Sequence, residues 1–404
     1  MIVPASGQNA PLNLHRVLTR MRSDTWKVPG KTVLALDGVR GLAILGVMLH
    51  HSCSRLTAGF SVQQFMNWLL HLGWAGVDLF FVLSGFLITG ILLDSREAVN
   101  YFRSFYARRA LRIFPLYYLF LATGFLAFPL FVSPRWMPTP SDRWLYFCYL
   151  TNWQVLWVGP WGPSVMAHLW SLAVEEQFYF CWPLVVWALR PVRLLPTLLV
   201  SEGLVIVIRT AWVLEYGPSQ AVVIATISRM DGLLLGAVCA IVIRRYQIPG
   251  RFIQMCPFLI FIGLFSYIVM LLVSGDRDRF TESLGFPLLS LCFALVVLYA
   301  ALTDCQHGRI QSVLHNSTLV KTGKYAYGLY IYHVPLFYAG DRIIDRSVPA
   351  SIRQSTWFGY ASTAILIAVC YLIAKLSYNV FECHFLKLKR KFEPLYFEHV
   401  ATAV

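Results

Sequence analysis

Long apolar segments recur along the whole chain, and they decide which folds the chain can adopt. Each is about 18–25 residues long, the length that an α-helix needs to cross the hydrocarbon core of a bilayer. Of the 404 residues, 57% are hydrophobic and 13% are charged, as is typical of helical membrane proteins. We therefore expect an all-α fold, a polytopic membrane helical bundle, with no sizeable soluble domain.

Basic residues predict how the chain is oriented. The net charge is +14, and lysine and arginine gather between the apolar segments, as they do in cytoplasmic loops. The charge therefore does not indicate nucleic-acid binding. We expect about ten transmembrane helices with both termini cytoplasmic: a cytoplasmic tail over residues 1–32, a transmembrane domain over residues 33–386 and a second cytoplasmic tail over residues 387–404. The expected spans are roughly residues 33–52, 68–93, 111–132, 168–189, 194–214, 221–243, 252–273, 284–302, 325–339 and 357–380.

The segment of residues 133–167 does not fit this pattern of spans. It contains several tryptophans and prolines, and its apolar middle, residues 144–158, is too short to cross a bilayer comfortably. Tryptophan favours the membrane interface. We therefore expect this segment on the outer face, either as an interfacial segment or as a re-entrant loop.

The first expected span carries ionisable side chains on one face. Arg40 and His51 are eleven residues apart, so on a helix they lie within about 20° of each other and roughly 16 Å apart along the axis. Asp37 precedes Arg40 by one turn and is expected to pair with it. One interpretation is a functional polar track, with a cation near one end and a proton acceptor near the other. The alternative is that Arg40 extends to one interface while His51 caps the helix at the other.

Two further expected spans contain carboxylates. Asp78 lies well inside the second span, where a carboxylate needs a partner. In the fourth span, His168, Ser171 and Glu175 recur at three- and four-residue steps and therefore share one face. These groups suit either the orientation of a histidine or the lining of a wet cavity. The alternative is that Glu175 forms a structural ion pair with an arginine.

Two other patterns carry polar groups. Tyr327, Tyr330 and His333 follow one another at three-residue steps, which indicates a polar stripe inside the membrane or an aromatic belt near its surface. Arg109 and Arg112 begin the third span, where arginine side chains suit phosphate groups but also follow from the bias of cytoplasmic loops. The nine cysteines show no metal-binding spacing, so we expect no metal.

Taken together, the motifs resemble those of the acyltransferase 3 family of membrane acyltransferases. The resemblance covers about residues 36–386 and keeps the family's order. Two positions depart from the family pattern: Ala326 replaces a serine, and His384 replaces a proline. The matches are Arg40 and His51 with ten residues between them, GVDLFFVLSGFLI in the second span, Arg109 and Arg112 as RxxR, WSLAVEEQFY with Glu175 at the glutamate position, and Tyr327, Tyr330 and His333 as the late signature.

The resemblance implies transfer of an acyl group, most often acetyl, from cytoplasmic acyl-CoA to a hydroxyl of an extracytoplasmic carbohydrate acceptor. It implies a multi-pass protein of the bacterial cytoplasmic (inner) membrane, in contact with the lipid bilayer. His51 is then the expected general base, because histidine titrates near working pH. The other expected roles are orientation of His51 by Glu175 or Asp78, acyl-CoA binding by Arg40, Arg109 and Arg112, and substrate binding by Tyr327, Tyr330, His333 and His168.

A proton-coupled secondary transporter of a sugar or glycan precursor is the alternative function. Ionisable groups inside spans suit such a carrier as well. The sequence shows no inverted repeat and no pair of matching broken helices, which disfavours it. A non-catalytic glycan–lipid scaffold is a third, weaker interpretation.

Overall fold

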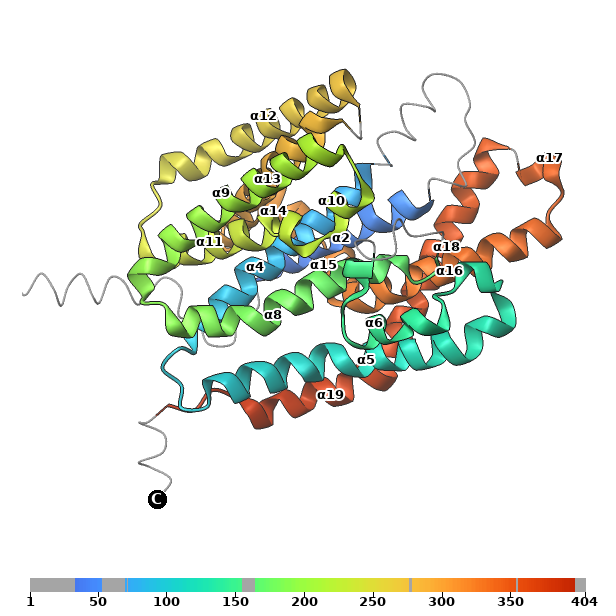
Figure 1. The fold of residues 1–404 in the computed structure, drawn as a ribbon, viewed down its shortest axis with the longest axis horizontal. Helices are drawn as coiled ribbons and strands as arrows, with labels where there is room; N and C mark the ends of the chain where they lie inside the picture. Colours follow the sequence, from blue (N-terminus) through green and yellow to red (C-terminus); the bar gives the residue numbers. More distant parts are fainter. Residues whose placement is uncertain are drawn as a thin grey trace, which may run out of the picture. The chain divides into compact units, whose positions relative to one another are not determined.

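The described part of the protein is built from helices alone. The computed structural model describes residues 33–52, 70, 72–154, 164–275, 278–353 and 355–396, and these residues contain α-, 3-10 and π-helices but no strand (Figure 1). The expected all-α fold is therefore confirmed for this part. The expected tail over residues 1–32, the beginning of the second expected span and residues 397–404 lie outside the described residues.

Seven helices of the described residues are long and apolar enough to cross a membrane. They support a multi-pass membrane protein, as the sequence predicts. They are Leu34–Ser52 (α2), Leu72–Asp94 (η2, Leu72–Ala75, and α4, Gly76–Asp94), Tyr101–Leu130 (within α5, Tyr101–Phe131), Pro191–Tyr216 (α9), Gly250–Ser274 (α12), Thr281–Leu302 (η8, Thr281–Gly285, and α13, Phe286–Leu302) and Thr356–Phe392 (α18, Thr356–Ser377; η9, Tyr378–Glu382; α19, Cys383–Leu388; η10, Lys389–Phe392).

The other three expected spans also contain helices, but these helices are not among the seven that are long and apolar enough to cross a membrane. They correspond to α8 (Trp170–Ala188), α11 (Asp231–Arg245) and α16 (Ala326–Ser347). Since α11 has only 15 residues, it is short for a membrane span. The ten expected spans therefore remain a prediction beyond the seven helices above.

The expected continuous span over residues 221–243 is wrong, because the chain is broken there. It forms α10 (Gln220–Ile224), the 3-10 turn η7 (Thr226–Ser228) and then α11. The break is stabilised by Ser228, whose hydroxyl donates to the Val222 and Ala225 carbonyls at 2.5 and 2.9 Å. Irregular backbone at membrane depth occurs where it is buried in protein or lines a cavity.

Two other expected boundaries also differ from the structure. The third span begins at Tyr101, ten residues before the expected start at residue 111, so Arg109 and Arg112 lie inside α5. The expected cytoplasmic loop before α16 instead contains α14 (Arg309–Leu314) and α15 (Ser317–Lys324), and α15 packs against α2. A Cβ atom on Gly323 would lie 1.9 Å from the Asp37 carbonyl oxygen, so this contact requires glycine.

The described parts of the segment of residues 133–167, residues 133–154 and 164–167, form short helices and turns. Tyr117 of α5 donates to the Tyr146 carbonyl at 2.8 Å, and Gln177 of α8 donates to the Tyr149 carbonyl at 2.8 Å. These bonds hold the segment against α5 and α8. Its middle, residues 155–163, lies outside the described residues. The described elements are η3 (Pro134–Trp136), η4 (Pro140–Asp142), α6 (Arg143–Phe147), η5 (Thr151–Trp153) and η6 (Ala167–Leu169).

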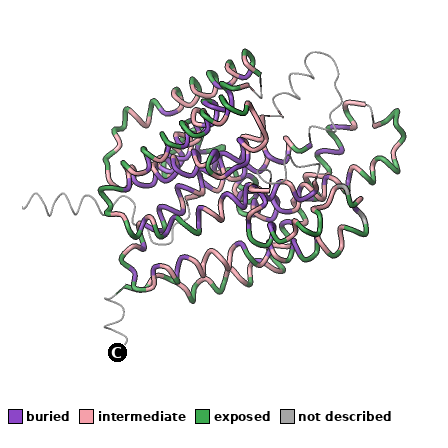
Figure 2. The backbone as a smooth tube through the Cα atoms, in the orientation of Figure 1, coloured by how far each residue is buried: buried purple, intermediate pink, exposed green. Residues whose placement is uncertain are grey.

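Burial divides the helices into central and peripheral ones. Helix α4 is largely buried, whereas few residues of α12 and α18 are buried (Figure 2). Helix α4 packs against α11 through glycines on both sides. A Cβ on Gly85 would lie 2.0 Å from the Leu233 carbonyl oxygen, and a Cβ on Gly236 would lie 2.1 Å from that of Val82. The backbones of α4 and α11 therefore touch, as small residues allow inside membranes.

We predict that Gly85→Ala lowers the free energy of unfolding by about 1–3 kcal/mol, because the added methyl group forces two backbones apart. The matched control is Gly203→Ala in α9, where an added Cβ meets nothing within 4 Å among the described residues. That variant should be neutral or slightly stabilising. The measurement is the melting temperature of each purified variant in detergent. Equal melting temperatures for the two alanine variants would contradict the close packing of α4 and α11.

Candidate active site

Two cavities lie between the central helices and contain most of the predicted site residues. The arginine cavity, of about 240 Å³, is lined by Arg40, Arg109 and Arg112. The histidine cavity, of about 320 Å³, is lined by His51 and His168. The second volume is within the range of small-molecule sites. The structure therefore separates the expected polar track of α2 into two chambers, with Arg40 in one and His51 in the other.

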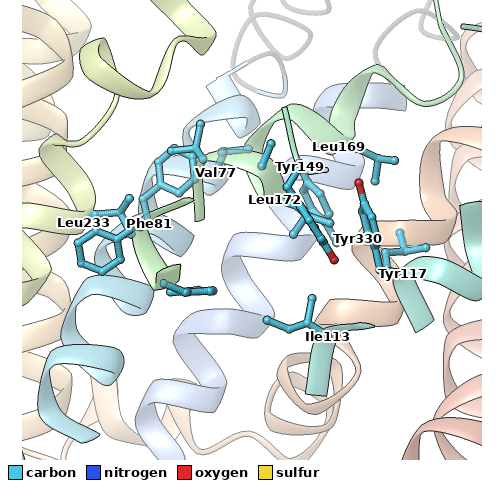
Figure 3. Packing of buried hydrophobic residues seen from close by; sticks show 14 of the residues in the cluster. Val77, Phe81, Ile113, Tyr117, Tyr149, Leu169, Leu172, Leu233 and Tyr330 are labelled. Atoms are coloured by element: carbon cyan, nitrogen blue, oxygen red, sulfur yellow. The ribbon is translucent and has the colours of Figure 1, made fainter. Parts of the chain in front are cut away.

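Val77 of α4 and Tyr330 of α16 line both cavities and form the wall between them. Both belong to the main buried cluster of hydrophobic residues (Figure 3). The Tyr330 hydroxyl donates to the His168 carbonyl at 2.7 Å and lies 2.5 Å from the Ser171 hydroxyl. The two contacts therefore fix the Tyr330 side chain at the place where the two cavities meet.

The position of the His51 ring is set by a carbonyl and by a second histidine. Its Nδ1 lies 2.9 Å from the Val47 carbonyl oxygen and 3.3 Å from Nε2 of His333. Nδ1 of His333 in turn lies 2.6 Å from the Tyr330 carbonyl oxygen. Because a carbonyl only accepts, Nδ1 of the neutral His333 ring carries the proton and its Nε2 accepts. His51 must then donate from Nδ1, which leaves its Nε2 with a free lone pair, as a general base requires.

His168 completes a cluster of three imidazoles. Its ring centroid lies 5.2 Å from that of His333, which lies 4.9 Å from that of His51. The His168 side chain donates from Nε2 to the Ile331 carbonyl at 3.2 Å. Its buried Nδ1 has no hydrogen-bond partner among the described residues. Of the predicted substrate-binding residues, His168 and Tyr330 therefore reach the histidine cavity, while His333 lies behind His51.

The arginine cavity gathers positive charge from three helical segments. Arg40 of α2 pairs with Asp37 at 2.7 Å, as predicted. Arg109 and Arg112 come from α5, and the Arg109 guanidinium lies 4.2 Å from the centroid of the Tyr179 ring. Tyr327, predicted to bind substrate, lines this cavity and donates its hydroxyl to the Ile113 carbonyl at 2.8 Å.

Lys389 is a fourth cation of this cavity, and the sequence analysis missed it. It comes from η10, which packs on α5 beside α19 (Figure 1). The lysines that follow the last expected span could have indicated a further cation, but the sequence does not show that the chain folds back along α5. With Glu175 and Glu176 as the carboxyl groups lining the cavity, and Asp37 paired to Arg40, a surplus of positive charge remains.

The predicted orientation of His51 by Glu175 or Asp78 stays a prediction; in the structure, Nε2 of His333 lies 3.3 Å from Nδ1 of His51. Glu175 lines the arginine cavity and accepts from the Ser84 hydroxyl at 2.6 Å, and it forms no ion pair with an arginine within the described part of the chain. Asp78 has the partner that a buried carboxylate needs: its Oδ1 lies 2.8 Å from Nη2 of Arg229. Arg229 was missed because the broken segment before α11 was expected to be a continuous span.

Comparison with known proteins supports the resemblance seen in the motifs. A family model described as an acyltransferase domain matches residues 33–375. O-acetyltransferase OatA of Staphylococcus aureus, in strains NCTC 8325 / PS 47 and COL, is 27% identical over 86% of this chain and 56% of its own length. The chain thus spans little more than half the length of these relatives. No solved structure matches the chain.

We predict that above the titration range of its histidines the protein carries His51 as the Nδ1–H tautomer. Nitrogen-15 NMR of histidine-labelled protein distinguishes the two tautomers by the shift of the unprotonated nitrogen, and a His51→Gln variant assigns the signal. In His333→Ala the Val47 carbonyl alone should hold the ring, so the signal should broaden or split. A wild-type His51 ring protonated on Nε2 would contradict the geometry.

Proposed function

Because the chain belongs to the acyltransferase family whose model it matches, we propose that it is a membrane O-acyltransferase with acyl-CoA as donor and an extracytoplasmic carbohydrate as acceptor. The enzyme class follows from the family. The donor, the acceptor and their two sides of the membrane are the proposal. The single observation that carries it is the pair of cavities that meet at Val77 and Tyr330.

The surplus of positive charge in the arginine cavity supports the donor. Acyl-CoA carries several phosphate groups, and arginine binds phosphate through paired N–H donors. Arg40, Arg109, Arg112 and Lys389 all line this cavity, and we assign them to binding of the CoA moiety and its phosphates. The acyl thioester then lies toward the wall formed by Val77 and Tyr330.

The tautomer of His51 supports the transfer step. We assign its Nε2 to accept the proton of the acceptor hydroxyl while the hydroxyl oxygen attacks the thioester carbonyl carbon. The carbon–sulfur bond then breaks, and the departing CoA sulfur takes the proton back from His51. The products are an ester and free CoA thiol, so the step balances without a metal or a covalent enzyme intermediate. His333 keeps the ring in the required tautomer.

The proposed roles of the two cavities imply how the protein is oriented in the membrane. We place the arginine cavity on the cytoplasmic side and the histidine cavity on the outer side of a bacterial cytoplasmic membrane, with both termini cytoplasmic and ten spans. Residues 1–32 and 387–404 are then cytoplasmic tails, and residues 33–386 form the transmembrane domain. Lys389 belongs to the second tail and lines the donor cavity.

We predict that His51→Ala lowers the turnover of acetyl transfer by about 10²–10⁴-fold, the range expected for loss of a general base. The assay is transfer of labelled acetyl from acetyl-CoA to a panel of methyl glycosides by purified protein in detergent. His307→Ala is the control, because this exposed histidine lines neither cavity. Wild-type turnover in a correctly folded His51→Ala protein would exclude the mechanism, and the absence of acetyl-CoA turnover in the wild type would exclude the function.

A further inference from the structure

Two buried arginine–aspartate pairs lie at the end of the break before α11, and they differ in how completely the arginine is bonded. Arg209 of α9 contacts both oxygens of Asp231, at 2.6 and 3.0 Å. It also donates to the Ser228 carbonyl at 2.9 Å and to the Ser283 carbonyl at 3.1 Å. Every guanidinium nitrogen of Arg209 therefore has an acceptor, and the pair serves to join α9, α11 and η8.

Arg229 is bonded far less completely. Its Nη2 contacts one oxygen of Asp78, while its buried Nε and Nη1 have no acceptor among the described residues. Its side chain is only 2% exposed, and its guanidinium lies 4.0 Å from the centroid of the Phe286 ring. Buried donors without acceptors are destabilising, so such a site calls for an explanation. Arg229 lines the histidine cavity, whereas Arg209 does not.

The charges around this cavity define what Arg229 can bind. The positive charge of Arg229 is already matched by Asp78, and Glu282 also lines the cavity. There is no surplus of positive charge, in contrast to the arginine cavity. An anionic ligand would therefore add an unbalanced negative charge at a site of low dielectric constant. Hydroxyl and ring oxygens of an uncharged ligand accept hydrogen bonds without that penalty.

The apolar part of the lining agrees with a ligand of this kind. Trp74, Trp170 and Tyr267 line the same cavity, and they offer flat surfaces beside the polar groups. Small-molecule sites commonly combine aromatic walls with a few placed hydrogen-bonding groups. A sugar ring presents both surfaces that such a site requires, apolar C–H faces and an edge of oxygen atoms.

We propose that Arg229 is the acceptor-binding residue of the histidine cavity, donating from Nε and Nη1 to oxygen atoms of the acceptor, and that the sugar unit it holds is uncharged. Asp78 positions Arg229 and does not act on His51. This inference rests on the proposed function, because it places the acceptor hydroxyl in the cavity that His51 lines.

The test must remove the free N–H groups without leaving Asp78 as an unpaired buried charge, which would be strongly destabilising. We choose the double variant Asp78→Asn/Arg229→Gln and the single variant Arg229→Lys, which keeps the charge. Asp231→Asn/Arg209→Gln is the matched control at the fully bonded pair. The two probes are methyl β-glucoside and methyl β-glucuronide, which share a ring and differ by one carboxylate.

We expect wild-type kcat/KM to favour the glucoside over the glucuronide by about tenfold or more. Loss of two hydrogen bonds should raise KM for the glucoside about tenfold or more in both Arg229 variants. The KM for acetyl-CoA should stay within about twofold, since donor binding depends on the arginine cavity. The Arg209 control should have a lower melting temperature but an unchanged KM for the glucoside.

Folded Arg229 variants with an unchanged KM for the glucoside would overturn the inference, and so would a wild type that prefers the glucuronide. A wild type that hydrolyses acetyl-CoA but neither acetylates nor binds either glycoside, judged by tryptophan fluorescence, would also overturn it. A wild type without acetyl-CoA turnover overturns the proposed function instead. In that case glucoside binding that is lost in Arg229→Lys would still support the site.

Discussion

A hydrogen-bonding or charged side chain buried among membrane helices must find a partner, and this constraint organises the centre of the protein. Asp78 is matched by Arg229, Asp231 by Arg209 and Asp37 by Arg40. The Asp78–Arg229 pair joins α4 to the break before α11, the Asp231–Arg209 pair joins α11 to α9, and the Asp37–Arg40 pair lies within α2. Arg229 and His168 keep buried nitrogen atoms without a hydrogen-bond partner among the described residues, and both side chains border the histidine cavity.

Close backbone contact gives these pairs their fixed geometry. Gly85 and Gly236 let α4 and α11 touch, and this contact brings Asp78 within reach of Arg229. Gly323 lets α15 lie on α2 next to Arg40. The outcome is a pair of cavities with unlike chemistry, one with surplus positive charge and one lined by histidines and aromatic rings. A phosphate-bearing donor suits the first cavity and an uncharged sugar suits the second.

Helix periodicity predicted the local features of the site but not its long-range contacts. The Asp37–Arg40 pair and the bounds of α2 follow from residues a few positions apart, so the sequence sufficed for them. His333, Lys389 and Arg229 reach the site only through packing between distant segments, which periodicity does not encode. The break before α11 was missed because apolar residues on both sides of residues 225–230 outweigh the polar ones in a hydropathy pattern.

The central claim is that donor and acceptor enter from opposite sides and meet at the wall formed by Val77 and Tyr330. Its most direct test uses sealed proteoliposomes in which a C-terminal tag reports protein orientation, with labelled acetyl-CoA on one side and methyl β-glucoside on the other. We expect acetylated glucoside when acetyl-CoA is on the side of the C-terminus and the glucoside is opposite. Product formed only when both substrates share one compartment would contradict the account.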